Sequence, residues 1–336
     1  MKEKKCRDML SDLSDSRTFL MGTAILGIVL FHMRAKSICP EGALAAFFND
    51  LVGMGYGGSD VFFFLSGFGI AYSLKKDSHY GRYLTRRARK LFPAYYPFIL
   101  VYLASAAWIR GITGKEILGN LTFVGFWFQW GNQFNWYIQS AMVFYLLAPA
   151  AWWVLKARRG WRACLILTAA ALALQLVFFG EYQMIAITRV PVFLLGLYLG
   201  TLEKGSMPWT RGRLAAVTAA YLAGLLLWRI SQPYLTWGNG LYWYPFLVIA
   251  PAGCFLTAAL RPYWLRLPWL RKTDDVICLC GRCSYEIYLV HLLFFETILA
   301  ECKGNLFWLA MAVVFTVLGI GYHNLVAAVL SKRNRT

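Results

Sequence analysis

Apolar runs long enough to cross a membrane recur from one end of this 336-residue chain to the other. Each is close to the roughly 20 residues that a transmembrane helix needs. We count ten such runs: residues 18–33, 58–74, 92–109, 135–155, 161–180, 185–202, 213–230, 241–260, 284–301 and 306–330. Only 15% of the residues are charged, against about 25% in soluble domains. We therefore predict an all-α integral membrane protein, a bundle of about ten transmembrane helices forming a single domain over residues 1–336.

A further apolar run, Asn120 to Trp130, is too short to cross the membrane. It has eleven residues, is rich in aromatic side chains and is bracketed by Gly119 and Gly131. Non-crossing backbone at membrane depth is tolerated where protein or a cavity surrounds it. We therefore expect a short re-entrant or interfacial segment near residues 120–130.

The positive charge follows a membrane topology. With the N-terminus inside, 27 of the 34 Lys and Arg residues fall in inner segments and six in outer ones, while Arg189 lies within a span. An excess of basic residues in cytoplasmic loops is the usual orientation signal. Both termini are therefore predicted to be cytoplasmic. The net charge of +18 does not predict nucleic-acid binding, because it is divided among short clusters between apolar runs.

The cysteines do not predict a metal site. Cys280 and Cys283 form a CxxC pair with Cys278 just before it, in a basic loop that we place in the cytoplasm. A metal or redox centre there would need more ligands, so we expect reduced thiols, no metal and no permanently bound cofactor.

The densest charge cluster lies in the expected inner loop 75–91. Arg82, Arg86 and Arg89 have helical i, i+4, i+7 spacing and share one face, and Arg87 lies beside them. One interpretation is anchoring to anionic lipid headgroups, at about 1 kcal/mol per charge. The other is a phosphate clamp, because guanidinium groups pair bidentately with phosphate. Proline at position 93 is expected in the first turn of the helix that follows.

Upstream of that loop, Asp60 stands at the start of the 58–74 run. A carboxylate there can cap the helix through its side chain and the helix dipole, and a catalytic role is the alternative. Ser66, Gly67 and Gly69 form a small-residue face that allows close helix packing.

Few ionisable residues lie inside the spans. A rise of about 1.5 Å per residue puts His32 about 22 Å along the helix from Arg17, most of the way across a hydrocarbon core of about 30 Å. Arg189 is costly near the bilayer centre and should face the protein interior, bound to an anion or to carbonyl groups. His291 is either a hydrogen-bonded structural group or a base.

Six stretches in order along the whole chain resemble the acyltransferase-3 family of membrane O-acyltransferases, which modify bacterial glycans and related substrates. The stretches are FLMGTAILGIVLFH, GYGGSDVFFFLSGFGI, YLTRRARKLFPAYY, WYIQSAMVFYLLAP, RVPVFLLGLYLG and SYEIYLVH. The resemblance implies transfer of an acyl group, typically acetyl, from cytoplasmic acyl-CoA to a hydroxyl of a glycan or other cell-envelope acceptor. It also implies location in a bacterial plasma membrane.

The resemblance assigns roles to residues of this chain. His32 matches the family's essential histidine, which would act as general base, and Asp60 and Ser66 match positions of its catalytic motif. Arginines that match or adjoin its paired arginines are expected to bind the phosphates of acyl-CoA: Arg82, Arg86, Arg87 and Arg89. Residues expected to bind the carbohydrate or lipid-linked acceptor or the acyl group are Arg17, Trp136, Tyr137, Arg189, Ser284 and His291.

Two positions depart from the family. Many members carry an arginine eleven residues before the histidine, where this chain has Met21. Arg17 lies one turn earlier on the same face and is a candidate substitute. Many members also carry a glutamate in the helix that matches residues 136–146, where this chain has Ala141 and Met142.

An alternative function is export or flipping of a glycan or its acylated precursor. Transporters usually contain a charged relay or an inverted repeat, and we find neither in the sequence. Membrane lipids are expected partners in both cases, and nucleic acid is not.

Overall fold

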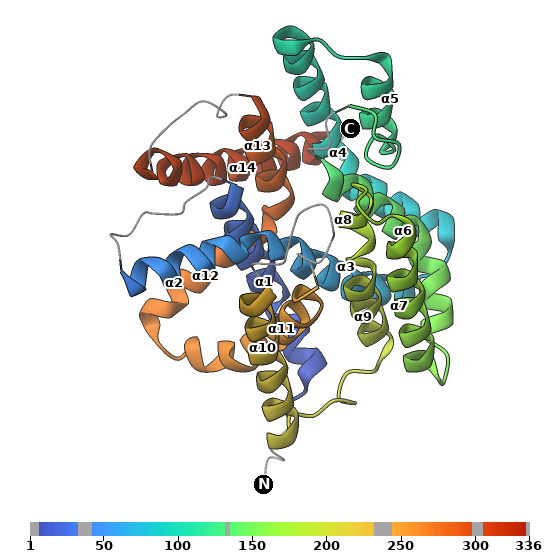
Figure 1. Ribbon diagram of the computed structural model, residues 1–336, viewed down its shortest axis with the longest axis vertical. Coiled ribbons are helices and arrows are strands. Elements are labelled where there is room, and N and C mark those ends of the chain that lie inside the picture. Colours follow the sequence, from blue (N-terminus) through green and yellow to red (C-terminus); the bar gives the residue numbers. More distant parts are fainter. Residues whose placement is uncertain (1–6, 33–41, 132–134, 232–243, 298–304, 334–336) are drawn as a thin grey trace. The chain divides into compact units, whose positions relative to one another are not determined.

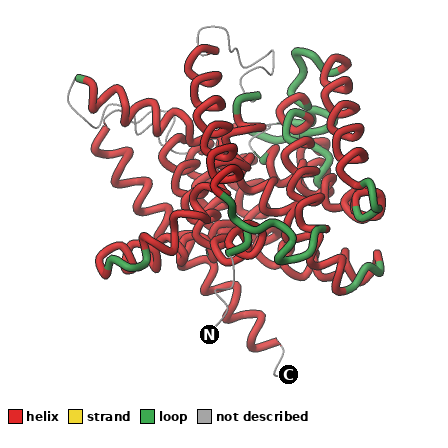
Figure 2. The backbone as a smooth tube through the Cα atoms, turned by 90° about the horizontal axis from the view of Figure 1, so that it is seen from below, coloured by secondary structure: helices red, strands yellow, loops and turns green. Residues whose placement is uncertain are grey.

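The computed structural model describes residues 7–32, 42–131, 135–231, 244–297 and 305–333, and the regular elements in these ranges are all helices (Figures 1 and 2). They are α1 (Met9–His32), α2 (Ala43–Gly53), the 3-10 helix η1 (Met54–Gly57), α3 (Gly58–Lys76), α4 (Tyr80–Arg110), α5 (Gly114–Thr122), α6 (Trp136–Leu155), α7 (Gly160–Val177), α8 (Met184–Ile187), α9 (Val190–Thr201), α10 (Arg211–Ser231), α11 (Phe246–Trp264), α12 (Pro268–Arg282), α13 (Ser284–Thr297) and α14 (Asn305–Arg333). The all-α prediction is confirmed for these residues. Residues 33, 241–243 and 298–301 of the expected spans lie outside the described ranges.

Among the described residues, eight helices are long and apolar enough to cross a membrane. They are α1, α4, α6, α7, α10, α11, the stretch Met184–Thr201 formed by α8 and α9, and Leu309–Ser331 of α14. A ninth span results if α12 and the part of α13 up to Leu293, which meet at a bend of 69°, count as one. The chain is therefore a multi-pass membrane protein. The expected count of ten included α3, whose glycines, serines and charged ends make it too polar to qualify.

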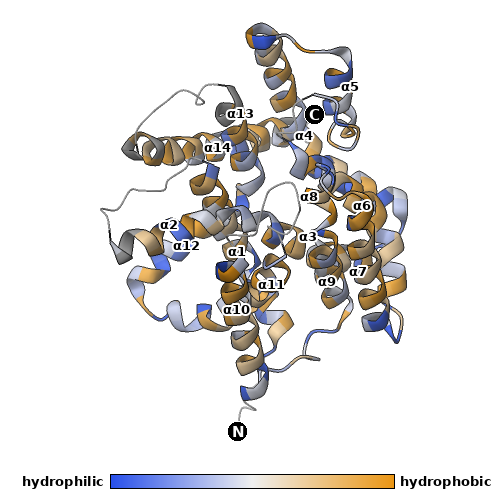
Figure 3. Cartoon of the chain, viewed as in Figure 1, coloured by the Kyte–Doolittle hydropathy of each residue, from blue (hydrophilic) through white to orange (hydrophobic). Residues whose placement is uncertain are grey.

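Apolar residues run along several of these helices, as the orange stretches of α7, α10 and α14 in Figure 3 show, and many of their side chains are exposed. On α7 they include Leu165, Ile166 and Leu176, and on α10 they include Leu226 and Ile230. A water-soluble protein rarely exposes large contiguous apolar patches. Lipid tails are the natural neighbours of these faces.

The chain groups into two compact units, each assembled from three segments. Unit 1 comprises Met1–Leu20, Asp60–Leu84 and Ser140–Asp275, and unit 2 comprises Met21–Ser59, Thr85–Gln139 and Val276–Thr336. The long helices α1, α4, α6 and α12 each contribute residues to both units.

In unit 1, helices α3 and α9 pack with their backbones in contact. A Cβ atom built on Gly67 would lie 2.2 Å from the carbonyl oxygen of Phe193, and one built on Gly196 would lie 2.0 Å from that of Phe64. Only glycine allows such an approach. The predicted small-residue face is thus confirmed for Gly67, whereas Gly69 faces the guanidinium of Arg17.

Helix α1 begins nine residues earlier than the apolar run predicted, at Met9 instead of Thr18. The side chain of Asp8 caps it, accepting a hydrogen bond from the backbone N–H of Ser11 at 3.0 Å. A second oxygen of Asp8 accepts from the N–H of Met207 at 2.9 Å. Polar residues can begin a helix when a cap satisfies its first N–H groups, and hydropathy alone does not detect this.

Helix α4 also begins earlier than predicted, at Tyr80, so that the arginine-rich stretch is helical instead of a loop. Pro93 and Pro97 lie inside this helix, and the prediction that Pro93 lies in its first turn was wrong. A proline removes one backbone hydrogen bond inside a helix. Helix α4 nevertheless continues through both prolines over its 31 residues.

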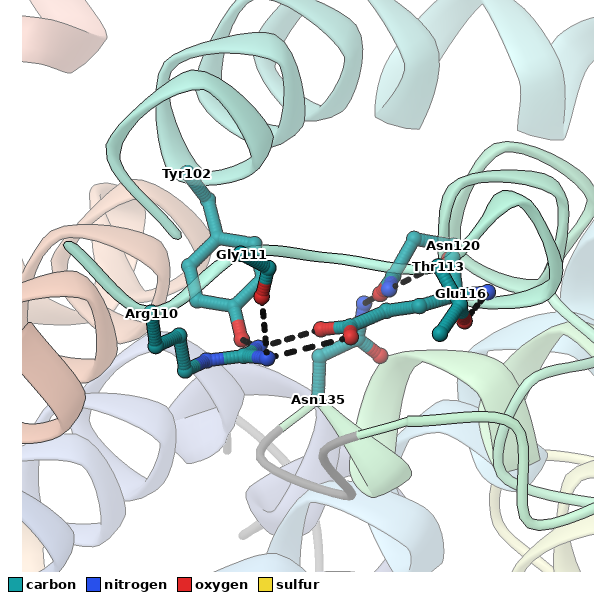
Figure 4. Close-up of polar contacts among 7 residues, drawn as sticks. All are labelled: Tyr102, Arg110, Gly111, Thr113, Glu116, Asn120 and Asn135. Atoms are coloured by element: carbon teal, nitrogen blue, oxygen red, sulfur yellow. Dashed lines mark hydrogen bonds and ion pairs between the residues drawn. The ribbon is translucent and has the colours of Figure 1, made fainter. Parts of the chain in front are cut away.

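In unit 2, the segment after α4 folds back on that helix through a buried polar network (Figure 4). Arg110, the last residue of α4, forms an ion pair with Glu116 in the first turn of α5 and donates to the hydroxyl of Tyr102 at 3.2 Å. Thr113 caps α5 by accepting from the N–H of Glu116. These contacts tie α5 to the end of α4.

The short aromatic run 120–130 is not a span. Asn120 lies in the last turn of α5, and turns follow from Phe123 to Gln129. Tyr95 of α4 donates to the carbonyl oxygen of Asn120 at 2.8 Å, and Gln139 of α6 accepts from the N–H of Phe126 at 2.7 Å. The protein itself thus satisfies the polar backbone groups of this non-helical segment.

Candidate functional site

Two histidines predicted at the site meet directly in unit 2. His32 is the last residue of α1, and His291 lies in α13. Nδ1 of His32 is 2.9 Å from Nε2 of His291. His291 is buried and His32 is half-buried. Nδ1 of His291 lies 3.1 Å from the carbonyl oxygen of Ile287, one helical turn earlier.

Two tyrosines continue this contact. The ring of Tyr288 lies 5.3 Å from that of His291 at an angle of 71°, and the ring of Tyr137 lies 5.1 Å from that of Tyr288. The first contact is edge-to-face and the second is tilted, and contacts of this kind favour particular ring orientations. Three predicted residues are thus connected. His32 contacts His291 directly, and Tyr288, which we had not predicted, links His291 to Tyr137. Tyr288 lies within SYEIYLVH, three residues before His291, and this spacing could have indicated it.

Two more predicted residues lie in unit 2 near these helices. Trp136 precedes Tyr137 and packs at 6.4 Å against Phe126 of the turn segment. Ser284 is buried and begins α13, two turns before His291. Both residues are placed by the helices that carry them, α6 and α13.

Asp60 and Arg189 form a buried ion pair in unit 1. Oδ2 of Asp60 is 3.3 Å from Nη2 of Arg189, and both side chains are fully buried. Nη1 of Arg189 also donates to the carbonyl oxygen of Ile185 at 2.6 Å. We expected Arg189 to face the interior and to bind an anion or a carbonyl group. It is buried and binds both, the carboxylate of Asp60 and the carbonyl of Ile185. Asp60 lies in the first turn of α3, two residues after its start, instead of at the cap.

Ser66 and Arg17 also lie in unit 1. The hydroxyl of Tyr145 in α6 donates to Oγ of Ser66 at 3.3 Å. Nε of Arg17 in α1 lies 3.4 Å from the carbonyl oxygen of Leu65, and its guanidinium packs on Gly69. Ser66 lies in the middle of α3, and Tyr145 and Arg17 contact the helix there.

The four predicted arginines lie on the first turns of α4. Arg82, Arg86 and Arg89 are exposed, and Arg87 is half-buried. Arg82 donates through Nε and Nη2 to both carboxylate oxygens of Asp77, at 2.8 and 3.0 Å. Helical spacing places Arg86 and Arg89 on the face of Arg82. This face is strongly basic, and Asp77 partly neutralises the charge of Arg82 on it.

Chemically, unit 2 contains two imidazoles in direct contact. The residues described here include no group of three or more His, Cys, Asp or Glu that could hold a metal ion. Unit 1 contains a buried carboxylate whose charge is compensated by a guanidinium. The histidine pair is thus the part of the predicted site that is arranged to accept a proton.

Comparison with known proteins adds one finding. A family model described as an acyltransferase domain matches residues 19–324, nearly the whole chain. No curated protein and no solved structure matches the sequence significantly.

Proposed function

Because this chain belongs to the acyltransferase-3 family, we propose that it transfers an acyl group from cytoplasmic acyl-CoA to a hydroxyl of a glycan or other cell-envelope acceptor. Acetyl is the simplest group that this reaction would transfer. Acyl-CoA is a donor substrate here and not a bound cofactor. The family match supports acyl transfer to a hydroxyl, while donor, acceptor and location in a bacterial plasma membrane are our proposals.

The observation that carries the mechanism is the contact between His32 and His291. In the proposed reaction, His32 takes the proton of the acceptor hydroxyl as its oxygen attacks the thioester carbonyl. The new C–O bond forms and the C–S bond breaks. The proton on His32 then passes to the departing thiolate of CoA. General-base assistance of this kind contributes about 10²–10⁴ in rate.

The exposed arginines of α4 would bind the donor. The diphosphate and the 3′-phosphate of CoA present several anionic oxygens, and Arg86, Arg87 and Arg89 offer guanidinium groups within about one turn of one helix. Arg82 already donates to the carboxylate of Asp77, so a phosphate bound by Arg82 would share its guanidinium with that carboxylate. Anchoring of the same face to anionic lipid is the alternative role.

The unit 1 residues would support this chemistry indirectly. We propose that Asp60 stabilises buried Arg189 and that both keep α3 and the segment before α9 in register, because a buried ion pair needs both partners. Ser66 and Arg17 would hold the middle of α3 through their bonds to Tyr145 and Leu65.

The test compares purified wild-type protein with His32→Ala, using radiolabelled acetyl-CoA and a panel of monosaccharide and lipid-linked glycan acceptors. We expect acetyl transfer to fall by about 10²–10⁴. His79→Ala, which changes an exposed histidine before α4, is the matched control and should retain activity.

Unchanged release of CoA by His32→Ala would contradict the proposed base. Export of unmodified glycan that depends on this protein, without any acetyl transfer, would instead support the exporter alternative.

A further inference from the structure

The hydrogen-bond chain of the two histidines determines which of their nitrogens carry protons. The carbonyl oxygen of Ile287 can only accept, so Nδ1 of His291, 3.1 Å away, must be the donor. A neutral imidazole has one N–H, which leaves the lone pair of His291 on Nε2. Nδ1 of His32, 2.9 Å from that nitrogen, must then donate to it. The lone pair of His32 is therefore on Nε2, the nitrogen that the proposed reaction needs.

The orientation of the rings agrees with this chain. Their centroids are 5.1 Å apart and their planes differ by 23°, while the two facing nitrogens are only 2.9 Å apart. The rings therefore meet edge to edge and nearly coplanar instead of face to face. In this orientation an N–H in one ring plane points along the lone pair of the other ring.

The environment favours the neutral form of His291. Its side chain is fully buried in α13, and a charged group in such a place costs free energy unless a counter-charge lies beside it. Its contacts include the carbonyl oxygen of Ile287 and the rings of His32 and Tyr288, and none of these is an anion. If His291 were doubly protonated, both of its nitrogens would donate and His32 would have to accept at Nδ1, which would move the lone pair of His32 to the wrong nitrogen.

From this geometry we propose that His291 is a positioning residue that fixes the tautomer and the ring orientation of His32. The proposal rests on the proposed function, because it assumes that His32 is the base. When Nε2 of His32 takes a proton, the ring becomes positively charged and its Nδ1–H bond to His291 becomes charge-assisted. His291 thus occupies the place that a carboxylate takes in a serine protease triad, without bringing a second charge into the membrane interior. The sequence had suggested acceptor binding for His291.

A matched pair of variants tests this. Glutamine places its amide near the position of Nε2 of histidine, so that His291→Gln keeps an acceptor for His32. Asparagine places its amide near Nδ1, so that His291→Asn keeps the bond to Ile287 and loses that acceptor. We expect His291→Asn to lower kcat by about 10²–10⁴ with little change in KM, and His291→Gln to recover most of that loss.

The outcomes separate this proposal from the proposed function. If His32→Ala is inactive and folded His291→Asn has wild-type kcat, the role of His291 is overturned and the role of His32 stands. Equal loss in folded His291→Asn and His291→Gln would also overturn it, because the acceptor would then not matter. If His291→Asn does not fold, a kcat near the wild-type value in His291→Ala overturns the proposal. Full activity of His32→Ala would overturn both the role of His32 as the base and the role of His291 in positioning it.

Discussion

The carboxylate of Asp60 lies 3.3 Å from the guanidinium of Arg189, and water reaches neither side chain. The two residues come from helical segments far apart in the sequence, α3 and the residue before α9. Each side chain therefore compensates the buried charge of the other. Both residues stand in stretches that resemble family motifs, and the ion pair gives these stretches a shared structural purpose.

Loss of one partner of this pair should destabilise unit 1. Asp60→Asn leaves Arg189 buried without a counter-charge, and breaking a buried pair costs about 3–5 kcal/mol. Thermal unfolding of the purified protein in detergent would measure the effect. The double variant Asp60→Asn with Arg189→Met removes both charges and should be more stable than Asp60→Asn alone. Equal melting temperatures for wild type and Asp60→Asn would show that the pair carries no charge-compensating role.

The contact between α3 and α9 should not tolerate a methyl group. Gly196→Ala places a Cβ 2.0 Å from the carbonyl oxygen of Phe64, and overpacking of this kind costs about 1–3 kcal/mol. Gly321→Ala is the matched control in the interior of α14, where no atom lies within 4 Å of the new Cβ. There alanine favours the helix by about 0.5–1 kcal/mol. Melting temperatures should therefore move in opposite directions, and a parallel shift would refute the packing argument.

The cap at the start of α1 should be sensitive to acid. Burial raises the pKa of Asp8, but hydrogen bonds from the backbone N–H groups of Gly205, Ser11 and Met207 outweigh this and hold it below the ordinary value of 3.8. A carboxylate with a lowered pKa in the folded state contributes stability above its unfolded pKa. That contribution disappears as the pH falls through the folded pKa.

Asp8→Asn provides the measurement. Its amide cannot carry the charge, so wild type should melt at a higher temperature than Asp8→Asn near neutral pH. The difference should shrink once the pH falls below the ordinary carboxyl pKa. A difference that stays constant across this range would indicate that the ionised cap contributes nothing.

The basic face of α4 should bind the donor. Arg86→Ala and Arg87→Ala each remove a guanidinium, and a hydrogen bond to a charged group contributes about 1.5–3 kcal/mol. We therefore expect the Kd for acetyl-CoA, measured by calorimetry, to rise roughly 10- to 100-fold in each variant. Added salt should weaken binding in the wild type more than in the variants.

Arg158→Ala changes an exposed arginine after α6 and serves as the control for total charge. If Arg158→Ala weakens acetyl-CoA binding as much as Arg86→Ala does, the α4 face acts only through net charge or lipid anchoring. The phosphate-clamp assignment would then be wrong.

The boundaries of elements show where local patterns fail. Hydropathy located α1 but missed its first two turns, because these turns are polar and depend on the cap that Asp8 forms. Hydropathy likewise placed the start of the third expected span at Phe92, although α4 begins at Tyr80 and passes through Pro93. In both cases the helix begins in polar sequence, so the apolar content does not indicate where it starts.

The sequence by itself determined the helical class, the membrane setting and the family, because apolar run length, loop charge and short motifs are local properties of a chain. It also placed His32 near the end of one helix and Asp60 near the start of another. Only the tertiary structure decided that His32 meets His291 and that Asp60 meets Arg189. Each pair joins helices distant in sequence, and a periodic pattern defines which face of a helix is apolar without defining which helix packs against it.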